Sequence, residues 1–220
     1  MAGVTCVVSA IHGFAGTGHV TPESVDHLGN VNLVDAAVTA AADVVMLSVV
    51  GAASDHPMEL FRAKAAAERY LRASGTDWTI VRATAFVELW ADILAKNIVF
   101  GRGDNPINFV AADDVAAVVE RVVTDATTRN SIVEVGGPRD VSFNQLAALL
   151  QDVRGGRPAR LRHVPRPVLR GMARFHRQPR AALAMDTIDM TFDAVAARRF
   201  PDLPMTEIGT ALGLLPPADA

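Results

Sequence analysis

The chain has 220 residues, of which 24 are acidic and 21 are Lys or Arg, giving a formal net charge of -3 and a pI near 6.0. This balance excludes a global electrostatic attraction to nucleic acid or to an anionic membrane. Cys6 is the single cysteine, so an internal disulfide is excluded and a reducing, cytoplasmic compartment is expected. The length is enough for one large domain with a full hydrophobic core.

The amino-terminal end and the longest apolar run bear on membranes and secretion. No basic segment precedes the apolar residues from Val4 on, which argues against a secretory signal. The longest apolar run, residues 36–53, has Asp43 near its middle, where a charge would be costly in hydrocarbon. We therefore interpret this run as a helix followed by a buried strand and expect no membrane partner.

Strands and helices alternate in the first part of the chain. Residues 4–10 predict a short strand, after which Thr21 caps a helix that has Pro22 at its first position and reaches about Ala42. Further strands are predicted at 44–50 and 78–82, separated by an alanine-rich helix at 57–73. This order is typical of an α/β fold with a parallel sheet.

The pattern after Arg82 is less regular. It predicts strands at 107–110 and 132–135, a helix at 113–123 with an acidic first turn, and a turn at Gly136 and Gly137. Ser142 and Gln145 resemble a capping box that opens a helix through Leu150. Weakly patterned helices are expected around 193–199 and 206–212.

Six stretches carry a family resemblance as an ordered set: VTCVVSAIHGF, SVDHLGNVNLVDAA, VVMLSVVGA, FRAKAAAERYLRASGTDWTIVRATAF, NFVAADDVAAVV and VEVGGP. They lie between residues 4 and 150 and resemble the NmrA-like branch of the extended short-chain dehydrogenases/reductases, which bind NAD(P) on a Rossmann sheet. The resemblance implies a partial Rossmann domain over 1–150, with interleaved substrate-lobe segments, and a smaller C-terminal α/β lobe over 151–220.

The resemblance also implies that the strand at 4–10 corresponds to the fourth strand of the family's sheet. The first three strands and their glycine fingerprint are absent from the sequence, so we expect weak cofactor binding and self-association through an exposed sheet edge. A rival interpretation takes residues 13–18 (GFAGTG) as the phosphate loop. The order of the glycines is wrong for it, and the helix starts only at Thr21 and Pro22.

Two residues are the candidates for catalysis. Lys64 lies on the apolar stripe of its helix, which also contains Leu60, Ala67 and Leu71. The alternative is that Lys64 lies at the edge of this stripe and extends its amine to water. The family places here the lysine that binds the nicotinamide ribose and assists a tyrosine acid four residues earlier, where this chain has Leu60. Ser48, at the carboxyl end of the strand at 44–50, is either a catalytic group or a structural cap.

The resemblance implies further contacts to the cofactor, from the ends of two strands. These residues are Ala10 and Ile11 after the first strand, and Ala83, Thr84 and Phe86 after the strand at 78–82. Phe14, Phe86 and Trp90 are candidates for the wall of an apolar substrate pocket, with ordinary core packing as the alternative.

Two other groups of residues bear on metal and nucleic-acid binding. His12, His19 and His27 lack the spacing that would place two imidazoles on one helical face, so no metal site is expected. The arginine-rich stretch after residue 153 could contact phosphates, but a solvated surface is the favoured interpretation and nucleic acid is not expected as a partner.

Two functions remain open at this point. The first is an NAD(P)-dependent oxidoreductase homologue acting on a small apolar carbonyl or quinone, with NAD and NADP not distinguished. The second is a non-catalytic dinucleotide sensor that binds a partner protein, an alternative favoured by Leu60 at the tyrosine position.

Overall fold

A computed structural model describes residues 3–14, 16, 18–155, 160–193, 199–203 and 205–213. The chain forms two compact units, one made of residues 1–83 and 116–135, the other of residues 84–115 and 136–220. The division expected from the sequence at residue 150 falls inside helix α5 (Phe143–Arg154).

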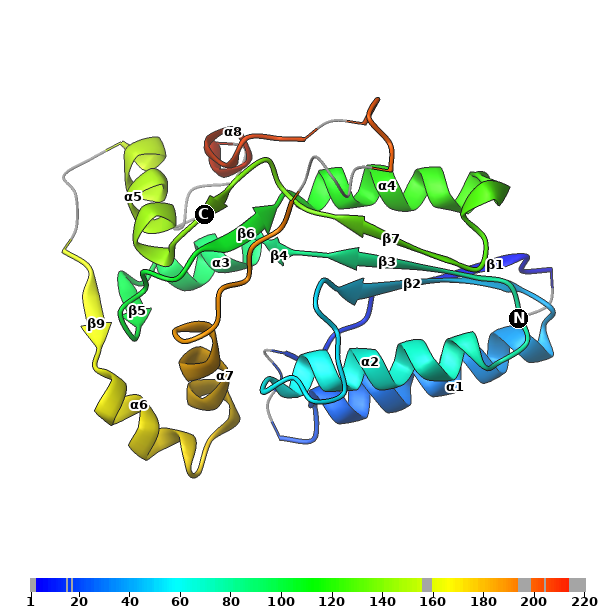
Figure 1. Cartoon of the computed structure of the whole chain (residues 1–220), viewed down its shortest axis with the longest axis horizontal. Helices are drawn as coiled ribbons and strands as arrows, with labels where there is room; N and C mark the ends of the chain where they lie inside the picture. The colour runs from blue at the N-terminus through cyan, green and yellow to red at the C-terminus, as the bar shows by residue number, and fades with distance from the viewer. Residues whose placement is uncertain are drawn as a thin grey trace. The chain divides into compact units, whose positions relative to one another are not determined.

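The first unit contains a four-stranded sheet in the order β1-β2-β3-β7, with every neighbouring pair parallel (Figure 1). Its strands are β1 (Cys6–Ser9), β2 (Asp43–Val49), β3 (Trp78–Ala83) and β7 (Ser131–Val135). The prediction that the first three strands are parallel is confirmed. Among the described residues β1 pairs with β2 alone, and Val8 on this edge strand is 46% exposed.

Helices cover both faces of this sheet, α1 and α2 on one side and α4 on the other (Figure 1). The elements are the π-helical turn η1 (Pro22–His27), α1 (Leu28–Thr39), α2 (Glu59–Arg72), α4 (Ala112–Thr124) and the short 3-10 helix η2 (Ala126–Thr128). Thr21 caps the first of these as predicted, because its side chain accepts the N–H of Ser24. α1 ends at Thr39, earlier than expected, since Ala41 adopts a φ of 51° in the turn that leads into β2.

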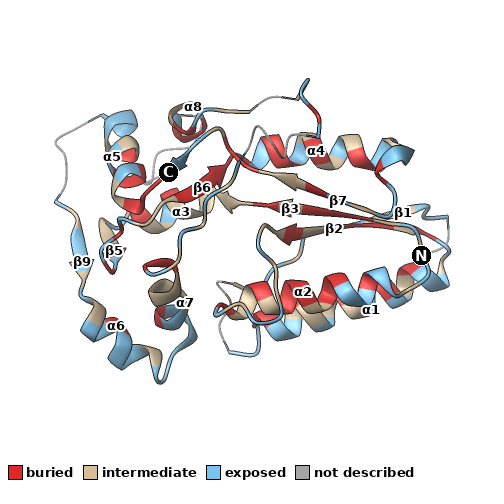
Figure 2. Cartoon of the chain, in the orientation of Figure 1, coloured by how far each residue is buried: buried red, intermediate tan, exposed pale blue. Residues whose placement is uncertain are grey.

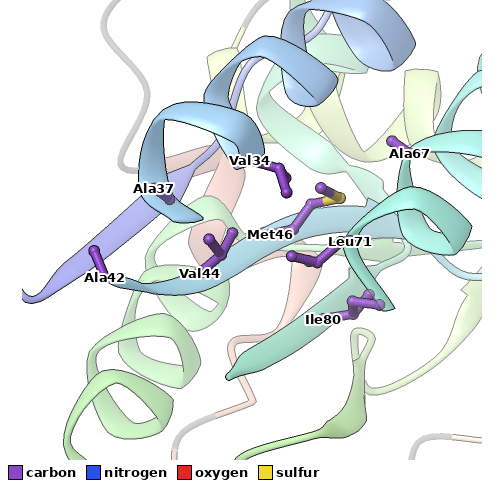
Figure 3. Packing of buried hydrophobic residues seen from close by; sticks show 8 residues of the cluster. All are labelled: Val34, Ala37, Ala42, Val44, Met46, Ala67, Leu71 and Ile80. Atoms are coloured by element: carbon purple, nitrogen blue, oxygen red, sulfur yellow. The ribbon is translucent and has the colours of Figure 1, made fainter. Parts of the chain in front are cut away.

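An apolar core lies between α1, α2 and the sheet (Figure 3). Its members are fully or almost fully buried: Val34, Ala37, Ala42, Val44, Met46, Ala67, Leu71 and Ile80. β2 and β3 are largely buried because helices cover both of their faces (Figure 2). This is why their sequences are nearly continuous apolar runs instead of alternating ones.

The second unit combines short strands with helices. Its strands are β4 (Ala85–Phe86), β6 (Ile107–Val110) and β8 (Asp140–Val141) in one group, and β5 (Ile98–Phe100) with β9 (Arg162–Val164) in another. Its helices are α3 (Val87–Leu94), α5, α6 (Arg166–Ala173), α7 (Arg177–Met185) and α8 (Ile208–Gly213). The predicted capping box at Ser142 and Gln145 opens α5, whereas most of the helix expected at 193–199 lies outside the described residues.

Asp186 joins three segments of the second unit. Its side chain accepts the N–H groups of Arg102 and Gly103 at 2.7 and 3.1 Å and the Nε of Arg166 at 2.5 Å. Only 3% of Asp186 is exposed, so these bonds hold a buried carboxylate between the 101–103 loop and α6. No helix among the described residues has the length and apolar character needed to cross a membrane.

Candidate functional site

The carboxyl ends of the parallel strands bring the predicted residues of the first unit to one edge of the sheet. The strand register places Ser9 of β1 beside Met46 of β2, and Ser48 beside Arg82 of β3. In open α/β sheets this edge is where ligands bind. The candidate site therefore consists of the ends of β1 and β2 and the part of α2 that faces them.

Lys64 is buried beside this edge. Only 4% of the residue is exposed, so the interpretation in which its amine reaches water is wrong. Its Nζ donates to the carbonyl oxygens of Ile11 and Leu47 at 2.9 and 3.0 Å and lies 3.0 Å from Oδ1 of Asp26. Two of the three N–H bonds of the ammonium group thus go to main-chain carbonyls, and its charge is paired with the Asp26 carboxylate.

Asp26 is the counterion of Lys64 and is fully buried. Its Oδ2 accepts the backbone N–H of Gly13 at 2.8 Å, and Oδ1 is contacted by Lys64 alone among the described residues. The amide of Asn30 donates to the Asp26 carbonyl, and the Ser9 hydroxyl donates to Asn30 Oδ1 at 2.6 Å. A connected polar network thus joins the end of β1 to η1, α1 and α2.

The sequence interpretation did not include Asp26 and Asn30, although a signal was present. The buried residues of η1 and α1 are Pro22, Asp26, Asn30, Val34 and Ala37, at spacings of four, four, four and three. Two polar residues therefore lie in the middle of a stripe that packs against the sheet. Buried polar groups of this kind need partners, and Lys64 on the neighbouring helix was the available cation.

Ser48 belongs to a second polar cluster. Its hydroxyl donates to Oε1 of Glu68 at 2.5 Å, and Glu68 is also held by two bonds from Arg82, at 3.0 and 2.6 Å. The bond to Glu68 and the smaller contribution of Glu134 together raise the pKa of Arg82 despite its burial. The proton of Ser48 is therefore directed to Glu68 in α2 and away from Lys64. This hydrogen bond links strand β2 to helix α2.

Tyr70 does not replace the missing tyrosine. Its ring is 39% exposed, and its hydroxyl donates to Asp35 of α1 at 2.6 Å. This bond raises the pKa of Tyr70. Because Leu60 stands four residues before Lys64 and Tyr70 faces α1, the described residues place no phenol beside the Lys64 amine.

The other predicted cofactor contacts are divided between the two units. Ala10 is exposed directly after β1, Ile11 contributes its carbonyl to Lys64, and Ala83 ends β3. Thr84 and Phe86 belong to the second unit, where the Thr84 hydroxyl donates to Asn108 at 2.9 Å. The structure thus brings Ile11 and the end of β2 to Lys64, while the roles of all these residues in cofactor binding stay predictions.

The candidate aromatic wall is likewise divided. Trp90 packs against Phe143 in the second unit, with ring centroids 4.7 Å apart. Phe143 is buried in turn against Phe109. For Trp90 these contacts support the core interpretation over a pocket wall. No cluster of three or more potential metal-binding side chains occurs in the described part of the chain.

Two glycines of the segment 13–18, Gly13 and Gly16, are closely packed against the residues that follow it. A Cβ on Gly13 would lie 2.4 Å from the Thr21 carbonyl oxygen, and one on Gly16 would meet Val20 at the same distance, so both glycines serve close packing within the loop. At the helix that follows, Pro22 has no N–H and the N–H of Ser24 is already bonded to Thr21. This helix start offers few donors to an anion.

Comparisons with known proteins agree with this geometry. A family model described as NAD(P)H-binding matches residues 1–126. Among curated proteins, the NAD(P)H azoreductase of Xenophilus azovorans is 30% identical over 134 residues, covering 58% of this chain and 46% of that protein. The photosystem II assembly factor Ycf39 of Synechocystis sp. is 29% identical over 168 residues, covering 73% of this chain and 51% of that protein. The chain spans about half the length of these relatives.

Solved structures share the fold at low identity. The NADPH-dependent quinone oxidoreductase QOR2 of Escherichia coli, in complex with NADPH, has a TM-score of 0.72 at 18% identity, covering 96% of this chain and 76% of its own. The triphenylmethane reductase of Citrobacter sp., in complex with NADP(H), has a TM-score of 0.73 at 16% identity with the same two coverages. Because the family model covers more than half of the chain, the chain belongs to the NAD(P)H-binding family, in agreement with its resemblance to NmrA-like short-chain dehydrogenases/reductases.

Proposed function

We propose that the chain is part of an NAD(P)H-dependent oxidoreductase that acts on a small apolar carbonyl or quinone. One observation carries this proposal: a lysine is buried at the carboxyl edge of the sheet, with its amine bonded to the carbonyl of Ile11, just after β1, and to that of Leu47 in β2. Burial of a lysine costs free energy that its partners must offset. One relative named an azoreductase and a structural neighbour named a quinone oxidoreductase support the same reaction class.

The residues of the first unit fit part of a dinucleotide site. Lys64 and the backbone around Ile11 are proposed to bind the nicotinamide ribose, for which Lys64 must exchange one of its protein partners for a ribose hydroxyl. The bound nicotinamide would supply the hydride, and the protein would orient it. The 13–18 loop and the capped start of η1 provide little for the pyrophosphate, so we propose that the 220-residue chain binds NAD(P)H weakly by itself.

Titration and turnover measurements test this proposal. NADH and NADPH fluorescence titrations of the 220-residue chain are expected to give affinities weaker than micromolar. A fusion that adds a Rossmann βαβ segment with the glycine fingerprint before Met1 is expected to bind more tightly and to oxidise NAD(P)H when a quinone is added. Micromolar binding by the 220-residue chain alone would contradict the weak-binding proposal and favour the 13–18 loop as a phosphate site.

A second candidate function is supported by Leu60 and by the pairing of Lys64 with Asp26. Both features remove the means by which a lysine and a tyrosine protonate a carbonyl oxygen. A dinucleotide sensor does not need to protonate a carbonyl oxygen. In the same assays, a sensor would bind cofactor in the fusion without quinone-dependent oxidation, whereas an oxidoreductase would show both.

We also propose that β1 is a site of self-association. Its outer edge is unpaired among the described residues, and Val4 and Val8 are 38% and 46% exposed. Open strand edges pair readily with other strands, and a charge on the edge prevents this. Sedimentation of the Val8→Lys variant should show less association than the parent chain, and equal association would exclude β1 as the contact.

A further inference from the structure

The arginine-rich segment of the second unit is unusual for a chain with a net negative charge. Between Asp152 and Asp186 the sequence has nine arginines and no acidic residue. The described part of this segment forms β9, α6 and α7. Its charge is therefore not neutralised by acids close in sequence, and most of α6 is exposed (Figure 2).

An apolar stripe runs along the exposed side of α6. Val168, Met172 and Phe175, spaced by four and three residues, are 49%, 44% and 81% exposed. Phe175 remains in helical register beyond the end of α6 because its N–H bonds to the Met172 carbonyl. Leu169, three residues before Met172, is fully buried and borders the stripe on one side, so α6 packs on the protein beside the stripe while the three residues of the stripe stay exposed.

Exposed cations accompany this stripe on the same helical segment. Arg170 and Arg174 are exposed and one helical turn apart. Arg166, in contrast, is bound to Asp186, and Arg180 donates to the Ala173 carbonyl. Within the residues that the structure covers, no ion pair joins Arg170 or Arg174 to an acidic side chain.

We propose that α6, extended to Phe175, docks on the surface of an anionic lipid bilayer. A bilayer interface binds both parts of this helix, because apolar side chains enter the acyl boundary while arginines contact the anionic headgroups. A nucleic acid would use the arginines but would leave Val168 and Met172 exposed. This proposal concerns a surface of the second unit and is independent of the proposed oxidoreductase activity.

Vesicle binding by the 220-residue chain tests the proposal. Cosedimentation is expected with vesicles of phosphatidylcholine containing about one-third phosphatidylglycerol, but not with pure phosphatidylcholine, and it should weaken as salt shortens the screening length. The Arg170→Gln/Arg174→Gln variant should bind about 30-fold more weakly. Phe175→Ala should bind roughly tenfold more weakly, since a large apolar side chain no longer enters the bilayer.

Matched controls separate this surface from general charge effects. The Arg69→Gln/Arg72→Gln variant loses the same charge from two exposed positions on α2 and is expected to bind as the parent does. A Phe175→Trp variant should show an additional blue-shifted emission on anionic vesicles, as the indole enters the bilayer.

Three results would overturn the proposal. One is the absence of binding to anionic vesicles, and another is equal weakening by the α2 control. The third is sedimentation of the parent as an oligomer without lipid that the Phe175→Ala and arginine variants abolish, because this would assign the stripe to a second copy of the chain.

Discussion

Replacing Lys64 with methionine removes the cation beside Asp26 and keeps most of the apolar volume of the side chain. Asp26 has no exposed surface, and its carboxylate would retain a single bond, from the Gly13 N–H. Breaking a buried pair by removing one partner costs about 3–5 kcal/mol.

This estimate is a large part of the 5–15 kcal/mol that stabilises a typical domain. The double variant Asp26→Asn/Lys64→Met removes both charges, so we expect it to recover most of the loss. Lys96→Met serves as the control, because Lys96 is exposed and has no buried counterion. Its effect should stay within about 0.5 kcal/mol.

Urea unfolding of the parent chain, Lys64→Met, the double variant and Lys96→Met measures these differences in the free energy of unfolding. The comparison requires that the slope of this free energy against urea concentration is the same for all four. A loss below about 1 kcal/mol would refute the idea that a buried charge pair holds this site together.

Three further outcomes are expected. Ser48→Ala should destabilise the first unit by about 1–2 kcal/mol in urea unfolding because Glu68 loses a buried donor, and a larger loss for Arg82→Met would identify Arg82 as its main partner. Burial alone would raise the pKa of Asp186, but the bonds from Arg166, Gly103 and Arg102 outweigh burial and lower this pKa below 3.8. The stability that Asp186 contributes is therefore complete above this value and is lost as pH falls below it. In an acid titration, the free energy of unfolding of Asp186→Asn should change less with pH than that of the parent chain. Gly137→Ala should lower the melting temperature strongly, because its Cβ would lie 1.8 Å from the Phe109 carbonyl oxygen.

The fold of the first unit could be predicted because its signals are local. β2 and β3 are apolar runs buried on both faces, and η1 begins where Thr21 and Pro22 indicated. The second unit was predicted less well. β4 and β8 have two residues each, too few for any periodicity, and α6 exposes an apolar stripe that hydrophobic patterning would assign to a core.

The site was predicted in part. Lys64 stood out as a charge within an apolar stripe, and the structure buries it. Its three acceptors could not be derived from one helix, because Ile11 and Leu47 contribute main-chain carbonyls whose direction depends on strand register. Ser48 was correctly placed at the strand end, but its partner Glu68 lies one turn after Lys64 on α2, and only the packing of α2 against β2 reveals the bond.

The pairing of Lys64 with Asp26 bears on which acceptors such a site could reduce. Hydride addition to a simple ketone leaves an alkoxide, which needs a proton donor in the transition state. Leu60 offers none, and the Lys64 ammonium is neutralised by a buried carboxylate 3.0 Å away. Hydride addition to a quinone leaves a phenolate, which is stable near neutral pH and takes its proton from water. Under the proposed oxidoreductase function, a site assembled around Lys64 and Asp26 would therefore reduce quinones more readily than ketones, and an intact protein that reduced both equally well would require a proton donor from outside this network.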